Sequence, residues 1–552
     1  MSNQVPSMSL HLGKHHAAVD ARLGSWCSEE IGRRMWDRDH TVWSYEPLPE
    51  LTNRLGWLDL ADSMQPRLSV FEALTRSVIE DGYSQIVLLG MGGSSLAPEV
   101  FAAVFGSAPG NPALTVLDST HPDAVCRVAR EIDPASTLFL VSSKSGTTLE
   151  TMSLFRTMWR RVSDVSEQPG HSFVAITDPG SSLHDLAEDR GFRQVIDAPS
   201  DVGGRYSALS PFGLVPAALI GASVTRLLTR TKVMAEASSP TVPADENPGL
   251  VLGAVLGELA LAGVDKVTFT TSPALAAFPA WIEQLVAEST GKNGMGILPV
   301  DSEPRVPPES YGNDRLFVNI ELAGDDPPNN QVDLNAIAEA GHPVVRIELA
   351  ERADLGQEMF RWEMATAAAG AVLGINPFDQ PDVQLAKELA KRAMAEPAGG
   401  SEAADGGSIS ITDTAVLGQE LDGWTQVRAG DYVAIQAYLP PTSETVAALQ
   451  RIRQTVGRRT GVATTLGIGP RFLHSTGQLH KGGPNTGRFL QLVDEPSEDV
   501  AVPETDYSFG TLIEAQALGD YRALLQRDRR VLRINLGSDV AGGLRRLLEM
   551  TS

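Results

Sequence analysis

Glycine- and hydroxyl-rich turns follow two apolar stretches of the sequence, at residues 90–95 and 142–148. A phosphate monoester carries about two negative charges and several acceptor oxygens, so it needs many donors in a small volume. Backbone N–H groups at a helix N-terminus, freed by glycines, supply part of these donors. Serine and threonine hydroxyls and the Lys144 ammonium can supply the rest. The two turns together therefore predict a phosphate site. Its candidate ligands are Gly93, Ser94, Ser143, Lys144, Ser145 and Thr148.

Each turn is expected to join a buried parallel strand to a helix. The strands are predicted over 86–89 and 137–141, the first helix over 96–105, and the second helix opens near Thr148 and Glu150. Turns at the carboxyl ends of neighbouring parallel strands can face one ligand.

Two other interpretations of these turns stay open. Either segment alone could be an ordinary turn with a helix cap, since serine, threonine and glycine are common there. A dinucleotide site could also use Gly90 and Gly92, with Asp118 ending the next strand. The sixth position of that fingerprint is Ser95 rather than glycine or alanine, which argues against it.

Composition narrows the class of partner. The chain has 552 residues and a net charge of −24, which disfavours nucleic acids and anionic membranes as partners. The only two cysteines, Cys27 and Cys126, predict neither a disulfide framework nor a zinc site, and fit a cytoplasmic protein. No signal peptide is recognisable, and the apolar stretch 249–264 is interrupted by Glu258, so we expect a buried helix there.

The length and the alternation of patterns predict an α/β protein with parallel sheets flanked by helices. We expect a helical arm over 1–75, an α/β domain over 76–235, a connection over 236–248 and a second α/β domain over 249–552. A helical insertion over 355–395 and a flexible loop over 396–408 interrupt the second domain. The predicted strands are 86–89, 114–117, 137–141, 173–177, 266–271, 316–320, 344–347, 432–436, 462–465 and 531–536.

Four further motifs lie at residues 201–207 (DVGGRYS), 284–292 (QLVAESTGK), 378–387 (FDQPDVQLAK) and 474–478 (HSTGQ). With the two turns, this set resembles the glucose-6-phosphate isomerases, which consist of two sugar-isomerase (SIS) domains. The resemblance covers residues from about 80 to 493. The order of the last two motifs is similar to that in the isomerase half of transaldolase fusion proteins, but the chain has no room for the fused barrel of roughly 250 residues.

The resemblance implies roles for individual residues. Glu288 would be the base that moves a proton between C1 and C2 of the open sugar through a cis-enediol. Arg205 would stabilise the developing negative charge, and His474 and Lys387 would open the sugar ring. Gly204, Gln284 and Gln380 would contact the substrate. Neither a metal nor a cofactor is implied, and the substrate would be a hexose 6-phosphate.

Two departures from the family pattern bear on these roles. Gln384 stands where the family has a glutamate, one turn before Lys387. The histidine motif comes last in this chain, whereas it precedes the FDQ motif in the ordinary isomerases, so His480 is a rival to His474. The family resemblance also implies that a neighbouring subunit supplies the histidine, and hence a homodimer.

Three functions follow as hypotheses. The first is a glycolytic and gluconeogenic isomerase of glucose 6-phosphate and fructose 6-phosphate. The second is a regulatory SIS protein that binds a sugar phosphate without catalysis, although binding alone does not require a base such as Glu288. The third is an isomerase that also accepts mannose 6-phosphate.

Overall fold

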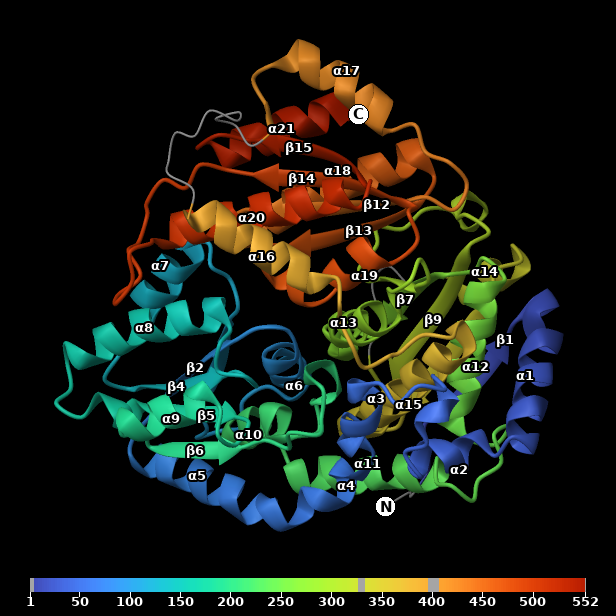
Figure 1. Ribbon diagram of the computed structural model, residues 1–552, viewed down its shortest axis with the longest axis horizontal. Coiled ribbons are helices and arrows are strands. Elements are labelled where there is room, and N and C mark those ends of the chain that lie inside the picture. The colour runs from blue at the N-terminus through green and yellow to red at the C-terminus, as the bar shows by residue number, and fades with distance from the viewer. Residues whose placement is uncertain (1–3, 326–332, 396–406, 552) are drawn as a thin grey trace.

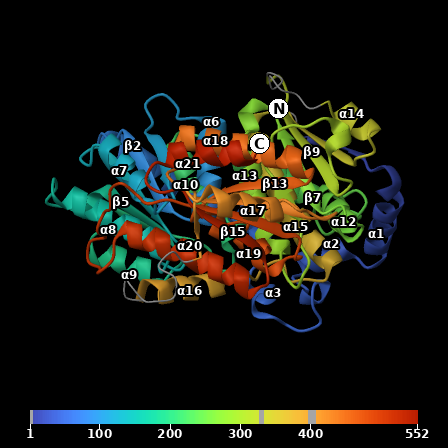
Figure 2. The same cartoon turned by 90° about the horizontal axis from the view of Figure 1, so that it is seen from above.

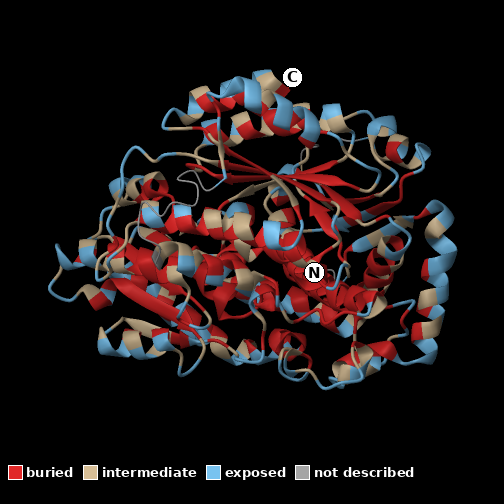
Figure 3. Ribbon diagram, turned by 45° about the horizontal axis from the view of Figure 1, so that its top comes forward, coloured by how far each residue is buried: buried red, intermediate tan, exposed pale blue. Residues whose placement is uncertain are grey.

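The computed structural model describes residues 4–325, 333–395 and 407–551, and within them the strands form three five-stranded sheets (Figure 1). Helices cover the sheets, and the strands at the centre of each sheet are almost entirely buried (Figure 3). The predicted α/β class with parallel sheets flanked by helices is therefore confirmed.

The first sheet has the order β3-β2-β4-β5-β6, and its strands are all parallel. The order reverses between β2 and β4, which makes the carboxyl ends of these two strands the expected ligand position. The strands are β2 (Gln85–Gly90), β3 (Ala113–Leu117), β4 (Thr137–Ser142), β5 (Phe173–Thr177) and β6 (Gln194–Asp197). The accompanying helices are α5 (Leu68–Glu80), α6 (Leu96–Phe105), α7 (Pro122–Glu131), α8 (Leu149–Ser163), α9 (Ser182–Asp189) and α10 (Pro211–Leu219).

The second sheet has the order β1-β10-β9-β7-β8, in which only β1 is antiparallel to its neighbour among the described strands. Its strands are β1 (Ser7–His11), β7 (Lys266–Thr271), β8 (Leu298–Val300), β9 (Arg315–Leu322) and β10 (Val344–Leu349). Its helices are α11 (Val224–Ala237), α12 (Pro248–Leu261), α13 (Phe278–Thr290), α14 (Leu334–Glu339) and α15 (Leu355–Leu373).

The third sheet has the order β11-β15-β14-β12-β13 and is parallel throughout. It lies across the other two sheets, as the red and orange elements show in both views (Figures 1 and 2). Its strands are β11 (Ile409–Ser410), β12 (Tyr432–Tyr438), β13 (Ala463–Ile468), β14 (Gly487–Val493) and β15 (Arg530–Asn535). Its helices are α16 (Val383–Ala395), α17 (Thr414–Trp424), α18 (Ser443–Thr460), α19 (Gly477–Gly482), α20 (Phe509–Gln526) and α21 (Val540–Thr551).

The N-terminal segment departs from the prediction of a helical arm over 1–75. It does contain α1 (His16–Ser28), α2 (Ile31–Trp36), α3 (Pro49–Asn53) and α4 (Leu60–Ser63). However, Ser7–His11 forms β1 and pairs with the edge strand β10. Met8 and Leu10 pack on the main core from this strand. Pairing with an available sheet edge thus determines the conformation of a segment too short to show strand alternation clearly.

All ten predicted strands overlap strands of the structure. The helix expected over 96–105 corresponds to α6, and the helical insertion expected over 355–395 contains α15 and α16. The range 249–552 contains two sheets, which the sequence did not distinguish. Most of the loop expected over 396–408 lies outside the described residues. None of the helices within the described ranges is long and apolar enough to cross a bilayer.

Helix α12 packs against α15 through glycines spaced four residues apart: Gly249, Gly253 and Gly257. A Cβ atom on Gly253 would lie 2.5 Å from the Cβ of Ala368 and 2.7 Å from the carbonyl oxygen of Ala365. The missing side chains therefore let the backbones of α12 and α15 approach closely. Helix α15 also contacts α13.

We expect Gly253→Ala to lower the free energy of unfolding by about 1–3 kcal/mol, because the added methyl group overpacks the α12–α15 contact. The matched control is Gly24→Ala on α1, where a Cβ atom would meet no other atom within 4 Å. That change should raise stability by about 0.5–1 kcal/mol through helix propensity. The measurement is the thermal unfolding midpoint of both variants. Equal shifts would contradict the packing argument.

Candidate active site

The two predicted phosphate turns lie side by side at the carboxyl edge of the first sheet. Gly90, at the end of β2, is paired with Ser142, at the end of β4. The Ser142 hydroxyl donates to the carbonyl oxygen of Ser94 at 3.2 Å. The turns thus meet at the point where the strand order reverses, as the sequence predicts.

The second turn is held open by its own hydrogen bonds. Ser143 Oγ lies 3.1 Å from Thr148 Oγ1 and accepts from the backbone N–H of Gly146 at 3.2 Å. Gly146 has a φ of +70°, which favours glycine. Ser143 is buried inside the turn, whereas Ser145, Thr147 and Thr148 line a cavity above it. Helix α8 begins directly after Thr148, so its N-terminal end faces the same cavity.

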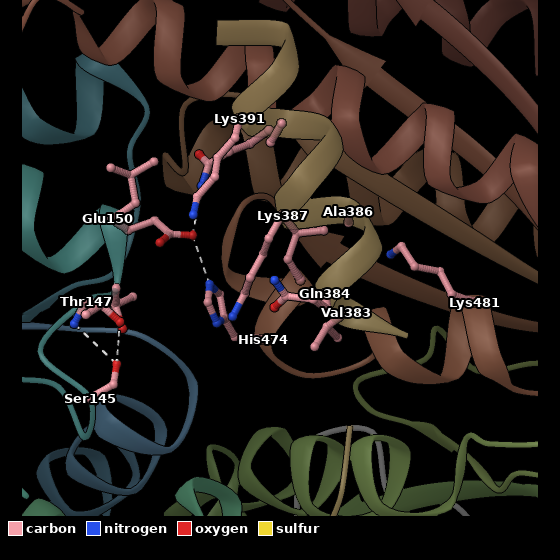
Figure 4. A pocket seen from close by; sticks show the side chains of 15 residues that line it. Ser145, Thr147, Glu150, Val383, Gln384, Ala386, Lys387, Lys391, His474 and Lys481 are labelled. Atoms are coloured by element: carbon pink, nitrogen blue, oxygen red, sulfur yellow. Dashed lines mark hydrogen bonds and ion pairs between the residues drawn. The ribbon is translucent and has the colours of Figure 1, made fainter. Parts of the chain in front are cut away.

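The cavity has a volume of about 310 Å³. Opposite the turn it is bounded by α16 and by the segment that precedes α19 (Figure 4). Lys387 extends from α16 toward His474, and the hydroxyl turn lies on the other side of the histidine (Figure 4). The polar residues that line the cavity are Ser145, Thr147, Thr148, Glu150, Gln384, Lys387, Lys391, His474, Lys481 and Gln516.

His474 forms an ion pair with a carboxylate that the sequence interpretation did not include. Its Nε2 lies 2.9 Å from Oε1 of Glu150, in the first turn of α8. Gln516 donates to the same oxygen at 2.8 Å, and Thr120 donates to Gln516 at 2.7 Å. Burial alone would raise the pKa of Glu150, but the charge and hydrogen bond of His474 outweigh it and lower that pKa. The carboxylate therefore orients the imidazole of His474.

The rival histidine, His480, is buried elsewhere. Its ring packs against Phe472 and Phe489, and its Nδ1 lies 3.2 Å from the Gln436 amide nitrogen. Burial lowers the pKa of His480 well below its usual value. Of the two histidines, His474 is the one that lines the cavity.

Glu288 lies beside this cavity and is connected to it through Gln284. Both residues are on α13, one turn apart, and both are buried. The Gln284 amide donates to Oε2 of Glu288 at 3.1 Å and to the backbone carbonyl of His474 at 2.7 Å. One side-chain amide therefore fixes the position of the acid relative to the histidine segment.

Arg205 lies on the other side of Glu288. Its Nη1 is 3.4 Å from Oε1 of Glu288 and donates to Gln380 at 2.7 Å. The other donors of this guanidinium bind Ser289 Oγ and the carbonyl oxygens of Pro377 and Asp379. Arg205 thus joins α13 to the chain segment that leads into α16. Its side chain is 2% exposed, so its donors already have protein partners.

Gly93 and Gly204 bring the first turn against the Arg205 segment. A Cβ atom on Gly93 would lie only 2.0 Å from the carbonyl oxygen of Gly204. A Cβ atom on the neighbouring Gly92, which has a φ of +55°, would meet Gln284 and His474 in the same way. Gly92 and Gly93 are therefore required by the close approach between the elements of the site, whereas a Cβ atom on Gly204 would meet no other atom within 4 Å.

Only two of the six predicted phosphate ligands, Ser145 and Thr148, line the cavity, whereas Gly93, Ser94, Ser143 and Lys144 do not. Lys144 forms an ion pair with Asp178, with Nζ 2.6 Å from the carboxylate, and burial lowers the pKa of this lysine. Ser94 is half-buried, and its carbonyl accepts from Ser142. Both residues stabilise the turns, while Ser145 and Thr148 carry hydroxyls into the cavity.

Lys292 binds the same chain segment before α16 that Arg205 binds. Its ammonium group donates to the carbonyl oxygen of Asp379 at 2.6 Å and lies 2.7 Å from the Asp379 carboxylate. Burial, reinforced by the positive charge of Arg205, lowers the pKa of Lys292 to about 7. The segment before α16 is therefore held by two buried basic side chains, those of Arg205 and Lys292.

The expectation that a neighbouring subunit supplies the histidine stays a prediction, and the position of His474 within the single chain bears on it. His474 lines the cavity of its own chain, together with Lys481 and Gln516 from the same third sheet unit. Arg471 anchors the segment to the first sheet through ion pairs with Glu99 and Asp118. The histidine motif, which here follows the FDQ motif in sequence, thus lies against the first sheet of the same chain.

Within the part of the chain that the structure describes, no group of three or more histidine, cysteine, aspartate or glutamate side chains is arranged to hold a metal ion.

A hydroxyl turn at a switch point, beside a His–Glu pair and an Arg–Glu pair, defines an α/β enzyme of phosphorylated sugars. A family model described as phosphoglucose isomerase matches residues 76–296. A glucose-6-phosphate isomerase of Rubrobacter xylanophilus is 30% identical over 368 residues, which are 58% of this chain and 84% of that protein. The glucose-6-phosphate isomerase of Thermus thermophilus is 28% identical, over 62% of this chain and 90% of that protein.

The chain belongs to the glucose-6-phosphate isomerase family. A solved structure of a hypothetical protein from Thermus thermophilus matches with a TM-score of 0.61 and 26% identity, covering 71% of this chain and all of that one. A glucose-6-phosphate isomerase structure from Chlamydia trachomatis shares the fold, with a TM-score of 0.51 and 23% identity over 68% of this chain and 80% of that one. The predicted resemblance and the enzyme class, an aldose–ketose isomerase, are thereby confirmed.

The depressed pKa of Lys292 predicts a pH dependence of stability. Between pH 7 and about 10 the unfolded chain binds a proton at this lysine that the native protein lacks, so stability should rise with pH. Lys292→Met should reduce this slope by up to about 1.4 kcal/mol per pH unit. The measurement is the free energy of unfolding at several pH values. The exposed Lys14→Met is the control, and identical slopes in all three proteins would contradict the assignment.

Proposed function

We propose that this chain interconverts glucose 6-phosphate and fructose 6-phosphate through a cis-enediol intermediate. The observation that carries the proposal is the Gln284 amide, which connects the Glu288 carboxylate to the His474 segment above the hydroxyl turn. Family membership supports the substrates and the type of reaction. With this activity the protein would act in glycolysis and gluconeogenesis.

The phosphate would bind at the second turn. Ser145, Thr147 and Thr148 offer hydroxyls into the cavity, and the N-terminus of the 15-residue helix α8 adds partial positive charge. In this proposal Ser143, Lys144 and Ser94 act through the turns, by holding their backbones in the shape that the phosphate needs.

Ring opening requires an acid at the ring oxygen and a base at the anomeric hydroxyl. His474 and Lys387 are the groups that we assign to these tasks, since both line the cavity beside the phosphate turn. Glu150 orients the imidazole of His474 from behind. It is a positioning residue, because its carboxylate already accepts from Gln516 as well.

Glu288 would then transfer the proton. From the aldose it would take the proton on C2 and return it to C1, while a second proton moves between O1 and O2. Arg205 would hold the Glu288 carboxylate in position through their ion pair, and its charge would lower the energy of the enediolate. Gln284 and Gln380 are held by hydrogen bonds at either side of the base.

Three further features belong to the same proposal. The chain would need neither metal nor cofactor, would work in the cytoplasm and could form a homodimer. The division into SIS domains over 76–235 and 249–552 also remains a proposal, with the second range containing two sheets. Since His474 comes from the same chain as the cavity, a homodimer would not be required to complete the site.

We expect Glu288→Gln to lower kcat by about 10²–10⁴-fold, because the amide has the shape of the acid but cannot accept the proton. The measurement is the conversion of fructose 6-phosphate, coupled to a dehydrogenase that reports glucose 6-phosphate. The matched control is Glu72→Gln on the exposed face of α5.

If the Glu288→Gln variant turned over fructose 6-phosphate as fast as the wild type, the assignment of Glu288 as the base would be overturned. Thermal stabilisation by fructose 6-phosphate without any turnover would instead favour the sugar-phosphate-binding regulatory protein. Equal turnover of mannose 6-phosphate would favour the dual isomerase.

A further inference from the structure

A second cavity lies on the opposite side of the sheets from the catalytic pocket. Its volume is about 260 Å³, and it is bounded by the loop 303–311, the first residues of β9 and β13, and the C-terminal half of α18. The catalytic histidine segment follows the other end of β13. The six residues of that strand span about 20 Å, so the two cavities are separate sites.

The charge of this cavity is opposite to that of the protein as a whole. Its lining contains Arg305, Arg315, Arg453 and Arg458 but a single carboxylate, Glu303. Burial raises the pKa of Glu303, but Arg315 overcompensates and lowers it, so the acid is ionised. The lining therefore carries three net positive charges in a chain of net charge −24. The C-terminus of α18 offsets only about half a charge.

Two of these arginines form the floor of the cavity. Both guanidinium ends of Arg315 bind the Glu303 carboxylate, at 2.9 and 3.1 Å, and Arg453 binds the backbone carbonyl oxygens of Asp301 and Ser302. The Nε–H of Arg315 has no hydrogen-bond acceptor among the described residues, although the side chain is only 2% exposed, and Asp314 Oδ1 lies 4.0 Å away. A buried, charged donor without an acceptor is costly, and an anion in the cavity would offset part of that cost.

The other two arginines have free guanidinium groups. Neither Arg305 nor Arg458 forms a hydrogen bond or ion pair with any residue that the structure describes. Arg305 is half-buried, and burial lowers its pKa, which shows the cost of leaving this charge without a counter-ion. By contrast Arg459, the next residue on α18, is paired with Asp422 at 2.7 Å outside the cavity.

We propose that this cavity is a second phosphate-binding site, for a small phosphorylated molecule or inorganic phosphate. Arg305 and Arg458 would bind the phosphate oxygens, since guanidinium groups bind phosphate with charge-assisted, often bidentate hydrogen bonds. Tyr311 and Val306 form an apolar wall that could contact a small organic part of the ligand. The site does not depend on the catalytic proposal, because it shares no residue with the catalytic pocket.

The test is isothermal titration of the full chain with pyrophosphate and, separately, inorganic phosphate. The Arg305→Ala/Arg458→Ala variant should raise the Kd of this site at least tenfold. Arg459→Ala removes the same charge from the neighbouring position and should change the Kd less than twofold. Thr148→Val, in the catalytic pocket, should leave the arginine-dependent binding intact.

Arginine-selective dicarbonyl labelling of the wild-type chain gives a second readout that needs no variant. Pyrophosphate should protect Arg305 and Arg458, but not Arg459, from labelling. Binding that Arg305→Ala/Arg458→Ala leaves unchanged, or that Thr148→Val abolishes, would overturn the proposal. An Arg458→Ala single variant gives a matched comparison with Arg459→Ala. Equal losses of pyrophosphate affinity in these two variants would also overturn the proposal, because they would indicate attraction by net charge alone. Stronger binding of pyrophosphate than of inorganic phosphate would support an organic phosphate with more than one anionic group.

Discussion

The buried guanidinium of Arg205 is the interaction on which the site depends. It contacts Glu288 on α13 and also holds the segment that leads to α16, through Gln380 and the carbonyl oxygens of Pro377 and Asp379. Removing one partner from a buried ion pair leaves an uncompensated charge, which costs about 3–5 kcal/mol. The position of the acid and the position of Lys387 on α16 are therefore set by one side chain. Lys292 strengthens the same junction through Asp379.

Much of this arrangement could be predicted from the sequence because the signals are local. Strands such as β2 and β4 are continuous apolar runs that end in glycine or hydroxyl residues, and the turns after them carry the donors of a phosphate site. The strand β14 was missed because Arg488 and Gln491 interrupt its apolar run. Both are buried, and they donate to Asp431 and to the Ala517 carbonyl oxygen, which lie far away in sequence.

The candidate site shows the same limit of sequence reasoning. Glu150 looked like an ordinary acid in the first turn of a helix, and only the packing of the third sheet brings His474 and Gln516 to it. Lys144 looked like a phosphate ligand, but Asp178 follows a neighbouring strand and binds it. A partner contributed by a distant segment leaves no mark in the local sequence. The division of residues 249–552 into two sheets could not be predicted for the same reason, because strand pairing joins segments that lie far apart in sequence.

The central claim is that one chain supplies both the Glu288 and the His474 of each site. Its most direct test is to co-express Glu288→Gln and His474→Gln chains with different tags and to assay the doubly tagged and mixed material for fructose 6-phosphate conversion. We expect no more activity than either variant has alone, because each site then carries one defect. If a second subunit supplied the histidine, one of the two sites in each mixed dimer would be intact, so activity would recover toward about half of the wild-type value in the doubly tagged material and about a quarter in the unsorted mixture. That recovery would contradict the account.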